Sequence, residues 1–160
     1  MIEILEYKNE HQPYFEKFNK AWIEKYFWIE DIDRFVLEHP DEAIIAAGGA
    51  ILMASYNGMI AGTVALKRVN SEVCEFTKMA VDEHFRRKGI AEALSHASFE
   101  KAKSLGATKV ILYSNTQLEG AIIMYKKIGF REIPIGDAAY KRSDIKMEIL
   151  LSDIPQLHNQ

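Results

Sequence analysis

The sequence predicts an α/β or α+β domain in which helices flank a mixed central sheet. Its 160 residues match the usual size of one domain. Hydrophobic residues make up 48% of the chain and charged residues 27%, so there is enough apolar surface to form a core. Segments with the period of a strand alternate with segments that have the period of a helix. No repeat or low-complexity tract divides the chain, and we therefore treat residues 1–160 as one domain.

The first part of the chain predicts one strand followed by two helices. Residues 2–7 alternate roughly between apolar and polar side chains, which is the pattern of a half-buried strand. Apolar side chains recur at helical spacing over residues 11–26. A shorter helix is predicted over residues 29–38, and it ends at His39-Pro40 because the residue before a proline disfavours helical geometry.

The middle of the chain predicts three strands. Residues 50–56 and 59–66 flank Asn57-Gly58, a pair that readily adopts the positive φ angles of a type I′ turn. These two segments therefore predict a hairpin. Residues 73–81 follow a short polar turn and predict the third strand.

Two helices and three strands are predicted over the rest of the chain. A glycine follows each helix in the position that a C-terminal cap needs. The helices are predicted at residues 89–105 and 120–128, and the strands at residues 109–113, 130–133 and 145–151.

The composition argues against several classes of protein. The net charge of -3 and the pI of about 6.0 oppose general nucleic-acid binding, which needs a basic field. The longest apolar stretch, residues 43–54, is shorter than the ~20 residues of a membrane span, and no signal-peptide pattern precedes it. A single cysteine, Cys74, excludes an internal disulfide, and the histidines show no metal-ligand spacing. We expect a cytoplasmic protein with no metal, membrane or nucleic-acid partner.

Charge is distributed unevenly along the chain. Residues 1–50 carry a net charge of -6, whereas residues 51–160 carry +3. A basic C-terminal part suits an anionic ligand, and an acidic N-terminal part suits a cationic one. Alternatively, both sets of charges are solvated surface.

Residues 78–91 join an apolar strand, a basic loop and the start of a helix. A helix start leaves backbone N–H groups unpaired and carries a partial positive charge, so it holds phosphate well. Gly89 allows a close approach of the backbone, and Arg86, Arg87 and Lys88 add cationic attraction. The segment therefore predicts a phosphate-binding turn. It is not a nucleotide P-loop, because no Gly-Lys-Ser/Thr follows.

Two motifs resemble those of one enzyme superfamily. Arg86-x-x-Gly89-x-Ala91 is similar to the (Gln/Arg)-x-x-Gly-x-(Gly/Ala) signature of the GNAT N-acetyltransferases. Downstream, residues 121–130 resemble the Ala-x-x-x-Tyr-x-x-x-Gly-Phe element of the same superfamily. The resemblance covers residues 50–151 and implies a mostly antiparallel GNAT-like sheet with acetyl-CoA or coenzyme A as co-substrate.

The resemblance also implies which residues bind coenzyme A. The strand end is expected to pair its backbone with the pantetheine arm, while its side chains pack in the core. The loop and the helix start are expected to hold the pyrophosphate through their backbone amides. These residues are Met79, Ala80 and Val81 for the arm, and Arg86, Arg87, Lys88, Gly89, Ile90 and Ala91 for the pyrophosphate.

Two further positions leave alternatives open. Family members often have glycine where Arg87 stands, so this arginine either reshapes the loop or points to solvent as another phosphate partner. Asn115 either hydrogen-bonds the pantetheine arm or caps the next turn.

Tyr125 and Glu75 are the candidate catalytic residues. In the family motif, the hydroxyl at the position of Tyr125 donates a proton or a hydrogen bond to the departing sulfur; the alternative is an aromatic residue that packs in the core. Glu75 has the alternation parity of Met79 and Val81 and is the candidate base, acting directly or through water. The alternative for Glu75 is an exposed strand carboxylate, and Glu30 and Glu72 are weaker candidates for the base.

The N-terminal part contains an aromatic cluster among acidic residues. In the superfamily this region lines the acceptor pocket, so such walls suit a cationic or aromatic amine. Ordinary packing of helix on sheet is the alternative. The cluster comprises Trp22, Tyr26, Phe27 and Trp28, and the acidic residues are Glu24, Glu30, Asp31 and Asp33.

The resemblance therefore implies an acetyl-CoA-dependent N-acetyltransferase. It would move the acetyl group to a primary amine of a small molecule or peptide by direct attack in a ternary complex. Edge strands in this superfamily often pair into homodimers. The alternatives are a non-catalytic acyl-CoA-binding or sensing domain on the same scaffold and, ranked lowest, another phosphate-ligand module, which leaves the Tyr125 element unexplained.

Overall fold

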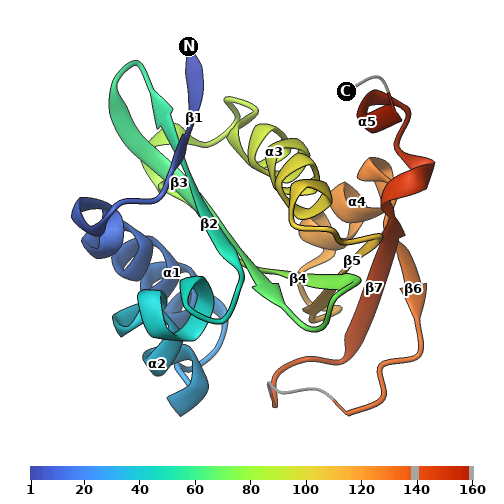
Figure 1. Cartoon of the computed structure of the whole chain (residues 1–160). Helices are drawn as coiled ribbons and strands as arrows, with labels where there is room; N and C mark the ends of the chain where they lie inside the picture. Colours follow the sequence, from blue (N-terminus) through green and yellow to red (C-terminus); the bar gives the residue numbers. More distant parts are fainter. Residues whose placement is uncertain (138–140, 159–160) are drawn as a thin grey trace.

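The computed structural model describes residues 1–137 and 141–158 and contains a seven-stranded sheet in the order β1-β2-β3-β4-β5-β7-β6 (Figure 1). The expected mixed sheet with helices around it is confirmed, and each predicted strand and helix is present. The strands are β1 Ile2–Glu6, β2 Ala50–Tyr56, β3 Met59–Arg68, β4 Val73–Val81, β5 Lys109–Ser114, β6 Arg131–Ile133 and β7 Ile145–Leu150.

The helices lie on both faces of this sheet, with α1 and α2 on one face and α3 and α4 on the other (Figure 1). They are α1 Gln12–Tyr26, α2 Asp31–Glu38, α3 Ile90–Ser104, α4 Glu119–Ile128 and α5 Pro155–His158. The short helix α5 and a helical turn at Asp41–Ile45 were not predicted, since neither is long enough to give a periodic pattern. None of the helices in the described part of the chain is long and apolar enough to span a membrane.

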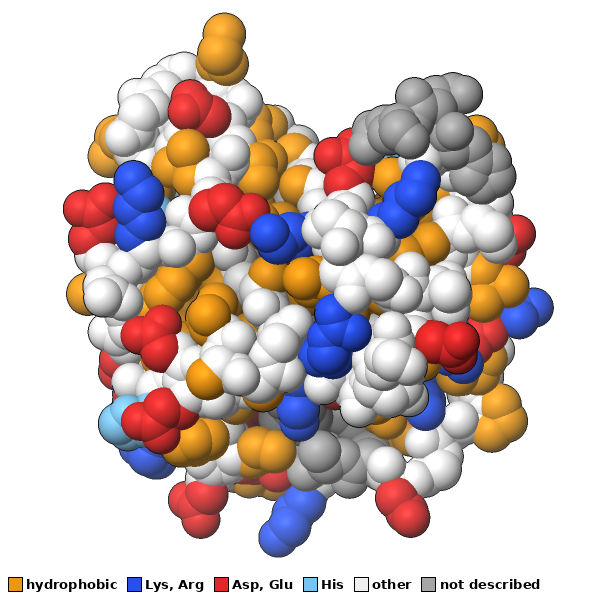
Figure 2. Space-filling view, in the orientation of Figure 1, with side chains coloured by type: hydrophobic (Ala, Val, Ile, Leu, Met, Phe, Trp, Pro, Cys, Tyr) orange, Lys and Arg blue, Asp and Glu red, His pale blue; other side chains and the backbone are white. Residues whose placement is uncertain are grey.

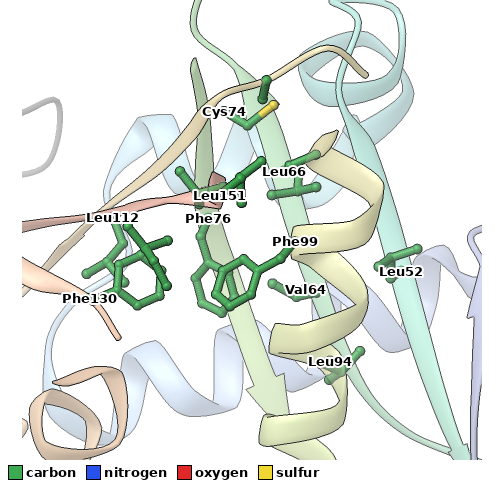
Figure 3. Packing of buried hydrophobic residues seen from close by; sticks show 14 of the residues in the cluster. Leu52, Val64, Leu66, Cys74, Phe76, Leu94, Phe99, Leu112, Phe130 and Leu151 are labelled. Carbon is green, nitrogen blue, oxygen red and sulfur yellow. The ribbon is translucent and has the colours of Figure 1, made fainter. Parts of the chain in front are cut away.

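Each face of the sheet has its own hydrophobic core. Under α3, the rings of Phe76, Phe99 and Phe130 pack together with leucines of the sheet and of α3 (Figure 3). Under α1 and α2, Phe15 and Leu37 pack against the opposite face. Two separate cores hold the two helical layers, so the sheet between them is buried on both sides.

The sheet opens between its two central strands. All neighbouring strands pair antiparallel except β4 and β5, which run parallel. That parallel pairing extends only from Val73–Glu75 on β4 to Lys109–Ile111 on β5. Beyond it, β4 continues to Val81 and β5 to Ser114 with no ladder between them in the described structure. The gap exposes backbone groups of both strands in the middle of the sheet.

A β-bulge in β4 corrects the expected parity of Glu75. Thr63 of β3 pairs with Ala80, but Ala65 pairs with Thr77, so β4 carries one extra residue there. Lys78, at the bulge, has a φ of 55°. Glu75 consequently lies on the face of the sheet that α1 and α2 cover, whereas Met79 and Val81 pack against the core under α3. Alternation alone could not reveal this, because one inserted residue reverses the face of everything before it.

Candidate active site

A cavity of about 290 Å³ lies in the gap between β4 and β5. Its wall comes from α1, β4, β5, the start of α3, α4 and the chain just before β7. The lining residues include eleven that the sequence singled out, namely Trp22, Tyr26, Phe27, Glu75, Met79, Ala80, Val81, Arg86, Ala91, Asn115 and Tyr125. Because the gap passes through the sheet, residues from both helical layers reach one cavity.

Tyr125 enters the cavity from α4, one turn after Ala121. Its ring packs edge-on against Phe76 and Phe130, with ring centroids 6.0 and 5.8 Å away, which fixes its orientation. Burial raises the pKa of Tyr125 to about 12, so the hydroxyl stays protonated at neutral pH. It can therefore donate a hydrogen bond.

Glu75 enters the cavity from β4, with only 6% of its surface exposed. Burial raises the pKa of its carboxyl, while the positive charges of Lys67, Lys78 and Lys146 act in the opposite direction. Within the described part of the chain, no side-chain hydrogen bond occupies this carboxyl. A carboxyl with a raised pKa in a cavity can accept a proton at a pH closer to neutrality.

The basic loop takes the conformation that an anion-binding turn needs. Gly89 precedes the first residue of α3 with a φ of 83°, in the left-handed region. The backbone N–H groups at the start of this 15-residue helix point out of its N-terminus. Arg86 lines the cavity, whereas Arg87, Lys88, Gly89 and Ile90 do not. The unpaired amides and the neighbouring cations fit a diphosphate.

A buried ion cluster borders the cavity on the opposite side. Asp33 of α2 is fully buried and accepts hydrogen bonds from Lys78 at 3.0 Å and from Arg142 at 2.6 and 2.7 Å. Burial alone would raise the pKa of Asp33, but the hydrogen bonds from Arg142 and the charge of Lys78 lower it overall. Arg142 also donates to Glu30 at 3.0 Å. Lys78 and Arg142 line the cavity, and both carboxylates stand behind them.

The sequence matches the acetyltransferase (GNAT) family over residues 5–130. The chain belongs to this family. N-acetylaspartate synthetase of Danio rerio is 33% identical over 102 residues, which cover 59% of this chain and 36% of that protein. An uncharacterised N-acetyltransferase of Methanocaldococcus jannaschii is 28% identical over 121 residues, which cover 72% of this chain and 50% of that protein. The matches thus span half or less of these relatives.

Solved structures of GNAT proteins have the same fold. A GNAT acetyltransferase from Staphylococcus aureus superposes with a TM-score of 0.85 at 23% identity, covering 94% of this chain and 99% of that one. YncA from Salmonella typhimurium, solved with acetyl-CoA, gives a TM-score of 0.71 at 15% identity, covering 94% of each chain. The expectation of a GNAT N-acetyltransferase fold is confirmed.

The residues predicted for the acceptor side of this GNAT domain divide into two groups. Trp22, Tyr26 and Phe27 line the cavity. Trp28 is 58% exposed and lies outside the lining, and the Glu30 carboxylate is bound by Arg142 and by the Lys141 amide. Asp31 and Glu24 are exposed away from the lining, as is Glu72, the weaker candidate base. The acidic residues that suggested a cationic acceptor therefore do not face the cavity.

Asn115 serves the turn after β5. Its Oδ1 accepts from the Gln117 amide at 2.8 Å, and its Nδ2 donates to the Arg142 carbonyl at 2.6 Å. The side chain caps the turn, as one of the two alternatives expected, and the residue also lines the cavity.

The ion cluster beside the cavity gave no recognisable sequence pattern as a cluster. Lys78, Asp33 and Arg142 come from three distant segments, and only the fold brings their charges together. Gly62 of β3 did leave a signal, since glycine inside a strand marks a close approach. A Cβ at this position would lie 3.0 Å from Ile90 Cγ2, so Gly62 allows the start of α3 to sit directly on the sheet.

Proposed function

We propose that this chain transfers an acetyl group from acetyl-CoA to a primary amine by direct attack within a ternary complex. The observation that carries the proposal is that Tyr125 and Glu75 line one cavity while coming from opposite faces of the opened sheet. A donor on one side and an acceptor on the other would meet between these two side chains. Membership of the GNAT family and the fold shared with proteins solved with acetyl-CoA or coenzyme A support this reading.

The loop at the start of α3 is the part suited to coenzyme A. The backbone amides of residues 86–91 would hold the pyrophosphate, with Arg86 as a cationic partner at the cavity wall. The pantetheine arm would run along the free end of β4, where, in the described part of the chain, Met79 and Val81 have no partner strand on the β5 side. Acetyl-CoA supplies the acetyl group in activated form, as a thioester.

Glu75 and Tyr125 would act on the two reacting partners, Glu75 on the attacking amine and Tyr125 on the departing sulfur. As the amine nitrogen bonds to the carbonyl carbon, Glu75 accepts the proton that the amine loses, directly or through water. The carbon–sulfur bond then breaks, and the hydroxyl of Tyr125 stabilises the charge that develops on sulfur. The departing thiolate then takes a proton from solvent water, so the products are the acetylated amine and the free thiol of coenzyme A.

The raised pKa of Tyr125 indicates whether its hydroxyl transfers a proton to the sulfur or only donates a hydrogen bond to it. A phenol with a pKa of about 12 is a weaker acid than an ordinary thiol, whose pKa is about 8.5. Complete transfer of its proton to the thiolate is therefore uphill. We expect Tyr125 to act mainly as a hydrogen-bond donor to the sulfur in the transition state.

A thiol-release assay with a panel of amines tests this function. The purified protein should release free thiol from acetyl-CoA in the presence of an accepted amine. Tyr125→Phe should lower kcat about 100-fold, the usual size of such a contribution, while the affinity for coenzyme A changes less than threefold. Binding of coenzyme A without thiol release from any amine or peptide would contradict catalysis and favour an acyl-CoA-binding domain.

A further inference from the structure

Residues 141–144, here called the strap, lead into β7 beside the gap in the sheet (Figure 1). One side of the strap is fixed to the turn that follows β5. The Asp144 carboxylate accepts hydrogen bonds from the amide and hydroxyl of Thr116 at 2.9 and 2.8 Å. The Asp144 amide donates to the Ser114 carbonyl at 3.0 Å. The strap is therefore anchored to the end of β5 and to the turn that follows it.

The other side of the strap is fixed to α2. The Arg142 guanidinium binds Asp33 through two nitrogens and also reaches Glu30. The Lys141 amide donates to the second oxygen of Glu30 at 3.1 Å. The carboxylates of Asp33 in α2 and of Glu30, which caps α2, thus hold two consecutive residues of the strap. The paired geometry of Arg142 with Asp33 fixes direction as well as distance.

We call the contacts of Glu30 and Asp33 with Lys141 and Arg142 the clamp. Lys78 connects this clamp to β4. Its side chain is 3% exposed, and its ammonium shares the Asp33 carboxylate with Arg142, whose side chain is 12% exposed. The cluster therefore ties together α2, β4 and the strap, which in turn is tied to β5. These are the elements on either side of the gap, and buried, directional ion pairs hold them at fixed separation.

The strap also forms part of the cavity wall, through Arg142 and Ser143. The cavity of about 290 Å³ lies just below the ~300–1,000 Å³ usual for small-molecule sites. On the face drawn in Figure 2, basic and acidic side chains are interspersed among apolar ones, and no wide field of one sign is visible to attract a charged polypeptide.

We propose that the strap is a size filter, so that the acceptor is a small free amine and not the N-terminus or a lysine of a polypeptide. A peptide acceptor must place its amine in the cavity while the following residues leave through an open channel. The ionic bridge from α2 to the strap closes the wall at that side. This inference rests on the proposed function, because it describes the acceptor of that same reaction.

Two matched bisubstrate probes test the filter without knowledge of the natural acceptor. In both, coenzyme A is joined through its sulfur and an acetyl bridge to a glycine amine. One probe ends there as glycinamide, and the other continues as a pentaglycine amide. Calorimetry on the whole protein measures both dissociation constants. We expect the short probe to bind at least tenfold more tightly than the long one. Equal or tighter binding of the long probe overturns the size filter.

Opening the clamp tests which residues are responsible. In Arg142→Gln the preference for the short probe should fall at least threefold, while the affinity for coenzyme A itself stays within twofold. Arg34→Gln is the matched control, because Arg34 lies exposed on α2, next to Asp33 in the sequence, and lines no part of the cavity. If Arg142→Gln does not fold, Glu30→Gln removes one contact of the same clamp. An unchanged preference in the folded variant overturns the role of the strap.

Failure of the proposed function has a different signature. If coenzyme A alone does not bind, the proposed function itself is wrong. If coenzyme A binds and the long probe binds as well as the short one, only the size filter is wrong.

Discussion

The two sides of the cavity are built in different ways. On the side of α3, the site consists of backbone: an opened strand end, a glycine with positive φ and the amides of a helix start. On the side of α2, it consists of charged side chains from α2, β4 and the strap, held together by buried ion pairs. The first kind of construction depends on short local sequence, and the second depends on the complete fold. The two sides should therefore respond differently to substitution.

The largest effect is expected on the side-chain-built half. Asp33→Asn leaves Lys78 and Arg142 buried with reduced compensation, and breaking a buried pair of this kind costs about 3–5 kcal/mol. We expect a loss of this size in the free energy of unfolding, measured by urea denaturation at pH 7. Asp31→Asn is the control, since Asp31 is exposed on the same helix. A loss similar to that of the control would show that the cluster does not stabilise the fold.

The same substitution should also change the response to acid. The pKa of Asp33 is lowered in the folded protein, so its ionised form stabilises the fold above the ordinary value of 3.8. That contribution disappears as the pH falls below this value. Asp33→Asn should therefore flatten the acid side of a plot of stability against pH, and an unchanged slope would contradict the assignment.

The next effect concerns the base. Glu75→Gln should lower kcat/KM about 100-fold, as expected for the loss of a positioned general base. Because the pKa of Glu75 is raised, activity in the wild type should fall on acidification at a pH above the ordinary glutamate value of 4.5. Lys67 pairs across the sheet with Glu75 and lowers its pKa. In Lys67→Met, activity should therefore begin to fall at a higher pH than in the wild type. If the pH of this fall does not change, the base is a group other than Glu75.

Sequence patterns predicted the strands, helices and turns of the backbone-built side. Residues 86–91 and 121–130 carry their information in short, contiguous motifs, and Asn57-Gly58 adopts the two positive φ angles expected for its turn. The predicted face of Glu75 was wrong, because a bulge shifts the register of β4 and no particular residue type in the sequence signals it. The acidic residues near Asp33 suggested a cationic acceptor, but their partners Lys78 and Arg142 lie 45 and 109 residues away. Long-range pairing of charges has no local signature.

A smaller effect is expected where α3 meets the sheet. In Gly62→Ala the new methyl group would lie 3.0 Å from Ile90 and 3.2 Å from the Ala80 carbonyl, which forces the start of α3 outward. Overpacking of this kind costs about 1–3 kcal/mol. We expect weaker binding of coenzyme A by calorimetry, together with a lower melting temperature. Gly120→Ala on α4 is the control, because nothing lies within 4 Å of a Cβ there. Unchanged affinity would indicate that the helix start does not hold the cofactor.

The smallest effect on the free energy of unfolding is expected at Arg87, where the substitution should stabilise the protein. Its φ of 61° is left-handed, which costs a residue other than glycine about 1–2 kcal/mol. This strain explains why glycine is common at this position in the family. Glycine relieves the strain but gains freedom in the unfolded chain, so Arg87→Gly should raise stability by no more than about 1 kcal/mol.

The comparison of Arg87→Gly with Arg87→Ala separates conformation from charge. Both remove the guanidinium, but only glycine relieves the backbone. Thermal unfolding should therefore distinguish the two variants. Arg87 lies outside the cavity lining whereas Arg86 is part of it, so either variant should weaken coenzyme A binding less than Arg86→Ala does. The opposite result would be that both Arg87 variants weaken coenzyme A binding as much as Arg86→Ala does, and that their difference from the wild type vanishes at high salt. Arg87 would then be a phosphate partner, and the backbone-built side would also depend on side-chain charge.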